Sequence, residues 1–262
     1  MVVGLERFRE HFRGLETSYA LIGGTACDAW MARSGLPFRA TKDLDIVLVI
    51  EALEPEFVVR FKGFVRGGRY QVRTRQETGT REFFRFMKPE EPDHPFMLEL
   101  FARTPTGIEL GPGQEIAPVA VEESVVSLSA ILLEQEFYEL VLATRYDADG
   151  VQMVGVDGLI PLKARAYLDL VERRARGAQV DQADIKKHRN DVFRLALTLP
   201  AVPGPERQRR IMEVVLSFLN AFPEGSPEWA SILQALKQTV RTPPVAADLL
   251  RTLSTYFRVG IT

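Results

Sequence analysis

The sequence lacks several features that mark particular classes of protein. It has a single cysteine, Cys27, so no disulfide can form within the chain, which favours a reducing compartment. It contains no run of about 20 apolar residues, the length that a transmembrane helix needs. Its first residues are charged and amphipathic and have no signal-peptide core. We therefore expect a cytoplasmic protein with no membrane partner.

The chain also has no large excess of positive or negative charge. The 33 lysines and arginines against 35 acidic residues give a net charge of −2, which exerts no global attraction on nucleic acid. Basic residues nevertheless concentrate in residues 60–85 and 163–194. These segments are either solvated faces of ordinary elements or a basic rim suited to a polyanionic acceptor.

The most informative stretch is residues 19–50. Residues 19–22 are predicted to form a buried strand, which is followed by a turn at Gly23 and Gly24 and by a short helix. Residues 43–50 are predicted to form a second strand. Glycine at a strand-to-helix junction lets a phosphate approach the backbone N–H groups of the helix N-terminus. Thr25 is expected to cap this helix or to donate its hydroxyl to that phosphate.

Two carboxylates stand at the start of the second strand. Asp43 and Asp45 flank Leu44, and alternate residues of a strand point to the same side, so both carboxylates face one way. Without a cation they would repel each other and raise the pKa of one of them. A hard divalent cation with oxygen ligands, above all Mg²⁺, removes this conflict.

A third carboxylate, Glu99, interrupts the apolar strand predicted for residues 96–101. A lone carboxylate in such a strand is costly unless it meets a cation or a hydrogen-bond network. Glu99 is therefore either a functional residue or a solvent-facing residue of an edge strand.

Hydrophobic periodicity predicts the remaining elements. In the first half we expect helices at 3–17, 54–66 and 134–144, strands at 70–74, 82–87, 125–133 and 151–156, and a turn at 77–80. In the second half we expect helices at 159–170 with Pro161 in the first turn, 181–199 capped by Asp181, 205–222, 227–240 and 244–257. The fold class is α+β: a mixed sheet flanked by helices in residues 1–157, followed by a helical domain in residues 158–262.

Two sets of motifs resemble one family. Gly23-Gly24-Thr25 followed by Arg39-x-Thr41-x-Asp43-Leu44-Asp45 resembles the polymerase-beta-type nucleotidyltransferases, and among them the AbiEii-type enzymes, known as toxins of type IV toxin–antitoxin systems. Residues 159–166 (LIPLKARA) and 184–195 (DIKKHRNDVFRL) are similar to the later two motifs of that family. Where the family often has R-D-x-x-D, this chain has His188 in place of the first aspartate.

The resemblance implies a nucleotidyltransferase fold and an enzyme that moves a nucleoside monophosphate from an NTP to an acceptor hydroxyl. Position by position, it implies that two Mg²⁺ ions are held by Asp43, Asp45 and Glu99. It implies that the nucleotide is bound by Gly23, Gly24, Thr25, Arg39, Thr41 and Lys187. It implies that Lys163 contacts the phosphates, and that Asp191 is a catalytic residue together with Lys163 and the three carboxylates. From the residues alone, Lys187 and Asp191 are also helix neighbours at i, i+4, the spacing of an ordinary surface ion pair.

In the toxin members of the family the acceptor is RNA, notably the 3′ end of tRNA. RNA or tRNA and a cognate antitoxin are thus the expected partners. Two alternatives stay open. One is a nucleotidyltransferase with a small-molecule or protein acceptor, which the nearly neutral charge favours. The other is a protein of this fold that binds nucleotide without catalysis.

Overall fold

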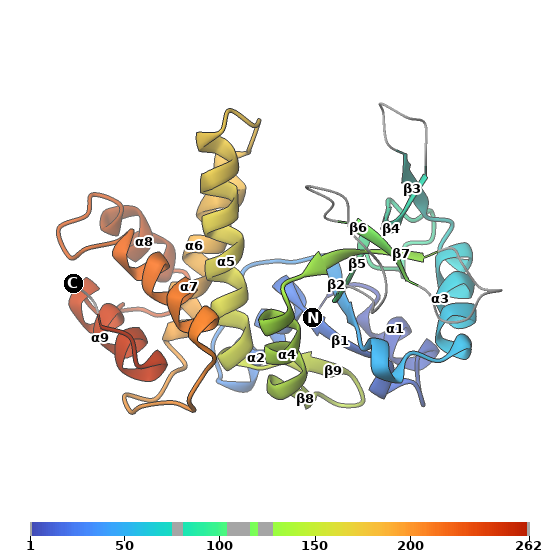
Figure 1. The fold of residues 1–262 in the computed structure, drawn as a ribbon, viewed down its shortest axis with the longest axis horizontal. Helices are drawn as coiled ribbons and strands as arrows, with labels where there is room; N and C mark the ends of the chain where they lie inside the picture. The colour runs from blue at the N-terminus through green and yellow to red at the C-terminus, as the bar shows by residue number, and fades with distance from the viewer. Residues whose placement is uncertain (1, 75–80, 104–115, 120–127, 261–262) are drawn as a thin grey trace. The chain divides into compact units, whose positions relative to one another are not determined.

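The structure is a computed structural model that describes residues 2–74, 81–103, 116–119 and 128–260 (Figure 1). Packing divides the chain into two units. The first comprises residues 1–29 and 40–154, and the second comprises residues 30–39 and 155–262. The turn predicted at 77–80 and the first part of the strand predicted at 125–133 lie outside the described residues. The sequence predicted a domain boundary at 157/158. It did not predict that residues 30–39 belong to the same unit as the C-terminal half.

The first unit contains the strands and the helices that pack on them. Its helices are α1 (Leu5–His11), η1 (Glu16–Ser18), the first part of α2 (Gly23–Arg33), η2 (Ile50–Ala52), α3 (Pro55–Gly67) and α4 (Gln135–Thr144). Its strands are β1 (Tyr19–Ile22), β2 (Asp43–Leu48), β3 (Gln71–Thr74), β4 (Arg81–Met87), β5 (Met97–Arg103), β6 (Ile116–Val119), β7 (Leu128–Leu133), β8 (Arg145–Asp147) and β9 (Gln152–Val154).

These strands form one mixed sheet in the order β3-β4-β5-β2-β1-β9-β8, with β7 pairing to β5 and β6 to β7. β2 is antiparallel to β1 and parallel to β5. β2 and β5 therefore lie inside the sheet, where their buried residues Leu44, Ile46, Leu98 and Leu100 form part of the core. The prediction of an α+β fold with a mixed sheet is confirmed.

An aromatic core covers one face of this sheet. Phe61 of α3 packs on Phe86 of β4, with ring centroids 5.5 Å apart. Phe8 of α1 and Phe12, the residue that follows this helix, pack on Phe64 and Phe61 of α3. Phe86 is the cross-strand partner of Leu98, whereas its neighbour Arg85 is the partner of Glu99. Because successive strand residues point to opposite faces, Glu99 lies on the face away from these helices.

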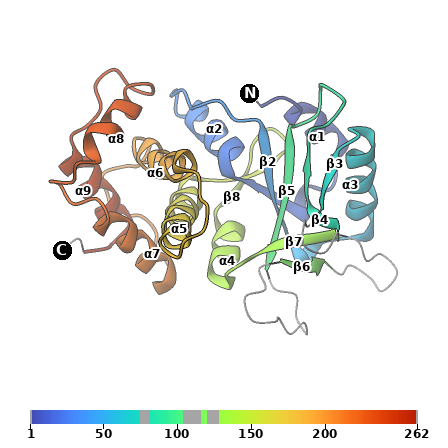
Figure 2. The ribbon, with the colours of Figure 1, turned by 90° about the horizontal axis from the view of Figure 1, so that it is seen from above.

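The second unit is helical. Its helices are the last part of α2, α5 (Val156–Ala175), α6 (Gln182–Ala196), α7 (Arg209–Asn220), α8 (Trp229–Leu236) and α9 (Ala246–Phe257). α5 and α6 run side by side in both views (Figures 1 and 2), and α7 packs on α5. The rings of Tyr167, Phe193, Phe218, Phe222 and Trp229 form the core between them. The predicted helical C-terminal half is confirmed.

Several predicted boundaries were wrong for local reasons. The first helix ends at His11 instead of residue 17, because Gly14 takes a left-handed conformation with φ 86°. α5 begins three residues earlier than predicted, so Pro161 lies inside the helix and not in its first turn. The full burial of Leu159 and Ile160 offsets the backbone hydrogen bond that proline removes. Asp181 caps α6 as predicted, accepting from the Ala183 N–H at 2.8 Å.

Two short strands, β6 and β8, were not predicted. β8 forms a hairpin with β9 around Asp149 and Gly150, both at positive φ, and such an Asp-Gly pair is a sequence signal for a hairpin. Of the helices that the structure describes, none is both long and apolar enough to cross a membrane.

Candidate functional site

The predicted acidic residues lie on adjacent strands. Asp45 of β2 is the direct partner of Glu99 on the parallel strand β5. Asp43 stands two residues before Asp45 and so shares its face of the sheet. Glu99, which follows Asp43 and Asp45 by 56 and 54 residues, therefore lies on the same face of the sheet as both of them.

Glu99 is buried, with 8% of its surface exposed, and it pairs with Arg85 of β4. Burial raises the pKa of Glu99, and the charges of Asp45 and Asp43 raise it further, so that together they outweigh the opposing effect of Arg85. Because β5 lies between β4 and β2, Glu99 is not on an edge strand. The alternative of a solvent-facing residue is therefore wrong.

Gly23 is required by its contact with Asp45. Its φ is +70°, and a Cβ atom built on it would lie 1.6 Å from Oδ2 of Asp45. α2 starts at Gly23, so Gly23 and Gly24 open the helix itself and do not form a separate turn. The absence of a side chain at residue 23 thus makes room for the carboxylate of Asp45. This requirement for glycine was not evident from the sequence.

Thr25 is the third residue of α2 and is almost fully buried. Its hydroxyl donates to the backbone oxygen of Asp43 at 2.7 Å. Thr25 is therefore inside the helix and not at the predicted cap position. Its hydroxyl ties the first turn of α2 to the first residue of β2, which carries the acidic pair. Thr41 is half-buried in the segment that leads into β2.

The carboxylates suit Mg²⁺ by their chemistry, since hard cations prefer oxygen ligands. The arrangement is not that of a preformed three-ligand site: in the described part of the chain, no group of three His, Cys, Asp or Glu side chains is placed to hold a metal ion. The guanidinium of Arg85 supplies the positive charge beside Glu99. Asp43 and Asp45 would be the two ligands of a bound metal ion. Glu99 would become a third ligand if the ion replaced Arg85 as its positively charged partner.

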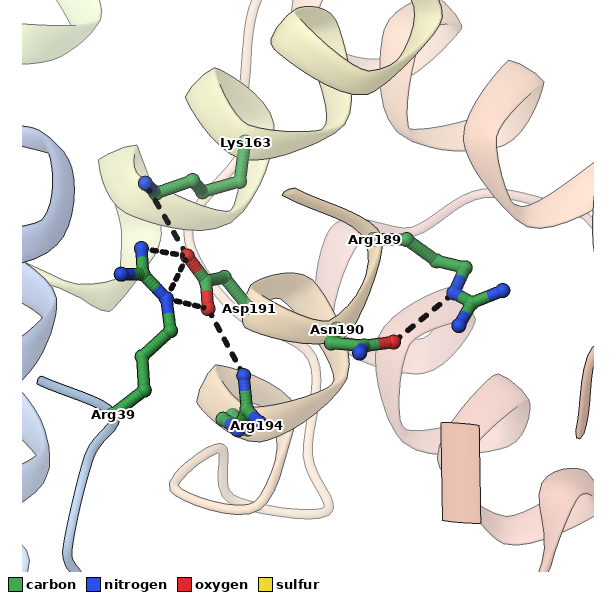
Figure 3. Close-up of polar contacts among 6 residues, drawn as sticks. All are labelled: Arg39, Lys163, Arg189, Asn190, Asp191 and Arg194. Atoms are coloured by element: carbon green, nitrogen blue, oxygen red, sulfur yellow. Dashed lines mark hydrogen bonds and ion pairs between the residues drawn. The ribbon is translucent and has the colours of Figure 1, made fainter. Parts of the chain in front are cut away.

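A second cluster lies within the helical unit, around Asp191 of α6 (Figure 3). Arg39 binds this carboxylate with two nitrogens, Nε at 2.9 Å from Oδ1 and Nη2 at 2.7 Å from Oδ2. Lys163 of α5 lies 3.4 Å from Oδ2, and Arg194 lies 3.2 Å from Oδ1. The forked contact fixes Arg39 more firmly than a single hydrogen bond would.

Asp191 is fully buried, and Lys163 and Arg194 each expose only 6% of their side chains. Burial alone would raise the pKa of Asp191, but the charges of Lys163, Arg39 and Arg194 outweigh it and hold the pKa below its ordinary value. The carboxylate is thus ionised and fully engaged by cations. It is suited to holding those side chains in place, and not to taking up a proton.

Among the predicted site residues, the structure brings together Arg39, Lys163 and Asp191, although Arg39 precedes Asp191 by 152 residues. Lys187 shares α6 with Asp191, but it is not among the described ion-pair partners of that residue. Sequence reasoning missed Arg85 and Arg194. Arg194 follows Asp191 by three residues on a helix, a spacing that could have identified it, whereas Arg85 required the strand register.

Three arginines of the basic segment at 60–85 form ion pairs. Arg60 pairs with Glu56, Arg69 with Glu90, and Arg85 with Glu99. These contacts give these three arginines a structural role.

The comparisons with protein-family models, with curated proteins and with solved structures each found no significant match to this chain. The similarity to the AbiEii-type enzymes therefore rests on the motifs in residues 23–45, 159–166 and 184–195.

Proposed function

We propose that this protein is a Mg²⁺-dependent nucleotidyltransferase that moves a nucleoside monophosphate from an NTP to an acceptor hydroxyl. RNA, and tRNA in particular, is the proposed acceptor, and the proposed setting is a type IV toxin acting in the cytoplasm with a cognate antitoxin. The observation that carries the proposal is the register that pairs Asp45 with Glu99, with Asp43 on the same face. Three carboxylates on adjacent strands have no evident use in packing.

The residues of the acidic site and of the cluster around Asp191 have different proposed roles. Asp43, Asp45 and Glu99 would hold Mg²⁺, which when bound neutralises phosphate charge and activates the acceptor hydroxyl. Gly23 keeps the space that the Asp45 carboxylate occupies, and the N–H groups at the start of α2 can bind phosphate oxygens. In the second unit, Lys163 and Arg39 provide cations for the triphosphate and for the departing pyrophosphate.

The experiment is incorporation of each labelled NTP into a total tRNA pool, with and without Mg²⁺. The Asp43→Asn/Asp45→Asn double variant is the matched control, because it removes two charges and keeps the side-chain shapes. Label on RNA with the native chain alone supports the proposal and identifies the base. If pyrophosphate is released only in the presence of a small molecule or a protein, that class of molecule, and not RNA, is the acceptor.

One observation favours a non-catalytic alternative, a protein that binds nucleotide without transferring it. Arg85 neutralises Glu99, so in this structure a third carboxylate is not available to a metal. Nucleotide binding without pyrophosphate release, with every acceptor tested, would establish this alternative and exclude the transferase.

A further inference from the structure

Glu99 has two direct cross-strand neighbours of opposite charge. β5 lies between β4 and β2 (Figure 2), and the strand register pairs Glu99 with Arg85 on one side and with Asp45 on the other. Directly opposed residues of neighbouring strands share one face of the sheet. Glu99 therefore stands between a cation and a carboxylate, and its side chain can lie toward either strand.

In this structure the Glu99 side chain contacts the cation. Both Nε and Nη2 of Arg85 lie against the same oxygen, Oε1 of Glu99. The pair is largely shielded from water, because only 11% of the Glu99 side chain and 28% of the Arg85 side chain are exposed. Such a pair is screened less than a surface pair, and the hydrogen bond from Nε is strengthened by the two charges.

The carboxylate of Asp45 contacts an element on the opposite side. Its Oδ2 atom lies 1.6 Å from the position that a Cβ on Gly23 would take, at the start of α2. α2 follows β1, and β1 pairs with β2 on the side away from β5. The carboxylates of Glu99 and Asp45 thus contact elements on opposite sides of the β2–β5 pair. This divergence accounts for the lack of a three-ligand metal group among the described residues.

A divalent cation that approaches Glu99 opposes the contact with Arg85. Positive charges a few ångströms apart repel each other, and the repulsion is strong where water is largely excluded. To join a metal ion held by Asp43 and Asp45, the carboxylate of Glu99 must therefore turn from β4 toward β2 and release the guanidinium.

We propose that Arg85 competes with the metal ion for the carboxylate of Glu99 and thereby sets the affinity of the acidic site for divalent cations. The inference rests on the proposed function only in taking the acidic site to be a metal site. Arg85 is a positioning residue, since in the metal-free protein it holds Glu99 beside β4. Because the two cations are alternatives, removal of Arg85 strengthens metal binding, whereas damage to the site would weaken it.

The test is Mn²⁺ binding to the full chain at neutral pH, measured from the electron paramagnetic resonance signal of free Mn²⁺, because Mn²⁺ prefers the same oxygen ligands as Mg²⁺. Arg85→Gln should tighten binding about tenfold or more, the equivalent of one hydrogen bond to a charged group. Arg85→Lys keeps the positive charge and should stay within about threefold of the native chain.

Arg66→Gln is the matched control. Arg66 is an exposed arginine of α3, the helix that packs on the other face of the sheet. The substitution removes the same charge, and because exposed charges are screened it should change the affinity less than about twofold.

A double variant tests whether the effect acts through Glu99. The affinity of Arg85→Gln/Glu99→Gln should match that of Glu99→Gln within about threefold, because the carboxylate for which the cations compete is gone. An equal gain from Arg85→Gln in both backgrounds would overturn the inference, since it would reflect a general loss of positive charge. Unchanged or weaker Mn²⁺ binding in folded Arg85→Gln would overturn it as well.

The release of Arg85 can also be observed directly. Its Nε–H donates to Glu99 in the metal-free chain. The ¹⁵N–¹H resonance of this group, assigned from its absence in Arg85→Lys, should move to the position of a solvated arginine when the site is saturated with Mg²⁺. Saturation with Mg²⁺ that leaves this resonance unchanged would contradict the competition.

The proposed function fails separately. Metal binding that responds to Arg85→Gln as expected, without nucleotide transfer to any acceptor, would support the competition and exclude the transferase. Nucleotide transfer by a chain whose Mn²⁺ affinity does not respond to Arg85→Gln would support the transferase and exclude the competition.

Discussion

At the scale of single residues, the chemistry of this chain depends on how each charge is compensated. Glu99 and Asp191 are both buried carboxylates, yet their pKa values move in opposite directions. Glu99 meets one arginine and two further carboxylates, whereas Asp191 meets three cations. The number of neighbouring charges of each sign decides the direction.

Asp191→Asn should destabilise the folded protein. Removing the carboxylate breaks its ion pairs with Lys163 and Arg194, which are both buried, and breaking a buried ion pair from one side costs about 3–5 kcal/mol. The measurement is urea unfolding at pH 7. Asp248→Asn is the control, because Asp248 forms an exposed i, i+3 pair with Arg251 and should have a much smaller effect. Equal effects of the two substitutions would show that the cluster does not stabilise the fold.

Glu99 should impose a pH dependence on stability in the absence of metal. Its pKa is raised in the folded state above the ordinary value of 4.5, so the folded protein holds this proton more tightly than the unfolded chain does. The free energy of unfolding of the native chain, minus that of Glu99→Gln, should fall as pH rises above 4.5 and level off above the folded pKa. Urea unfolding from pH 4 to 8 in a chelator measures this difference. A difference that rises over that range would contradict the raised pKa, and Glu213→Gln on the exposed surface of α7 controls for loss of a carboxylate.

At the scale of elements, close contacts between helix starts and strands build the acidic site. The first turn of α2 contacts β2 twice: at Gly23, through the space for Asp45, and at Thr25, through its hydrogen bond to Asp43. The first residues of α2 and β2 therefore form one structural unit.

Gly23→Ala should disrupt that unit. The substitution combines a left-handed backbone with a Cβ that overlaps the Asp45 carboxylate, so it should destabilise the protein and abolish Mg²⁺-dependent transfer. Gly14→Ala is the matched control: its φ is +86°, but nothing lies within 4 Å of the added Cβ. The control should cost only the backbone strain of about 1–3 kcal/mol. Thermal unfolding and the transfer assay measure both variants, and retention of full activity in Gly23→Ala would contradict the role given to Asp45.

The end of the chain is held by a comparable contact between elements. Tyr256 of α9 and Arg207 both bind Asp157 in the first turn of α5. Tyr256→Phe should therefore lower the free energy of unfolding by about 1.5–3 kcal/mol, the value for a hydrogen bond to a charged group. Tyr167→Phe is the control, because among the described residues the Tyr167 hydroxyl has no hydrogen bond and its ring packs on Phe218 and Phe222. An equal loss in both variants would show that the hydroxyl of Tyr256 contributes little.

At the scale of the whole molecule, the two clusters belong to different units. We expect their functions to be separable by substitution. Asp45→Asn should abolish nucleotide transfer and weaken Mn²⁺ binding about tenfold or more, by loss of a charged contact. Lys163→Met should impair nucleotide transfer and change Mn²⁺ binding less than about threefold, as expected for a substitution outside the metal site. Loss of Mn²⁺ binding in folded Lys163→Met would contradict the separate assignment, and Mn²⁺ titration with the transfer assay distinguishes the outcomes.

The sequence by itself determined the local elements and the kinds of chemistry available. Alternation placed Asp43 and Asp45 on one face of β2, and helical periodicity identified α6 with Asp181 as its cap. These features depend on neighbours a few residues apart, which a single sequence displays directly.

The tertiary structure alone decided which charges meet. The pairing of Glu99 with Arg85 and Asp45 follows from strand register, and the meeting of Arg39 with Asp191 follows from packing of residues 30–39 against the C-terminal helices. Burial and electrostatics act through space, so residues far apart in sequence set the pKa values of Glu99 and Asp191. For that reason the residue types indicated an acidic site and a phosphate site, while only the fold revealed the ion pair at Glu99 and the cation cluster around Asp191.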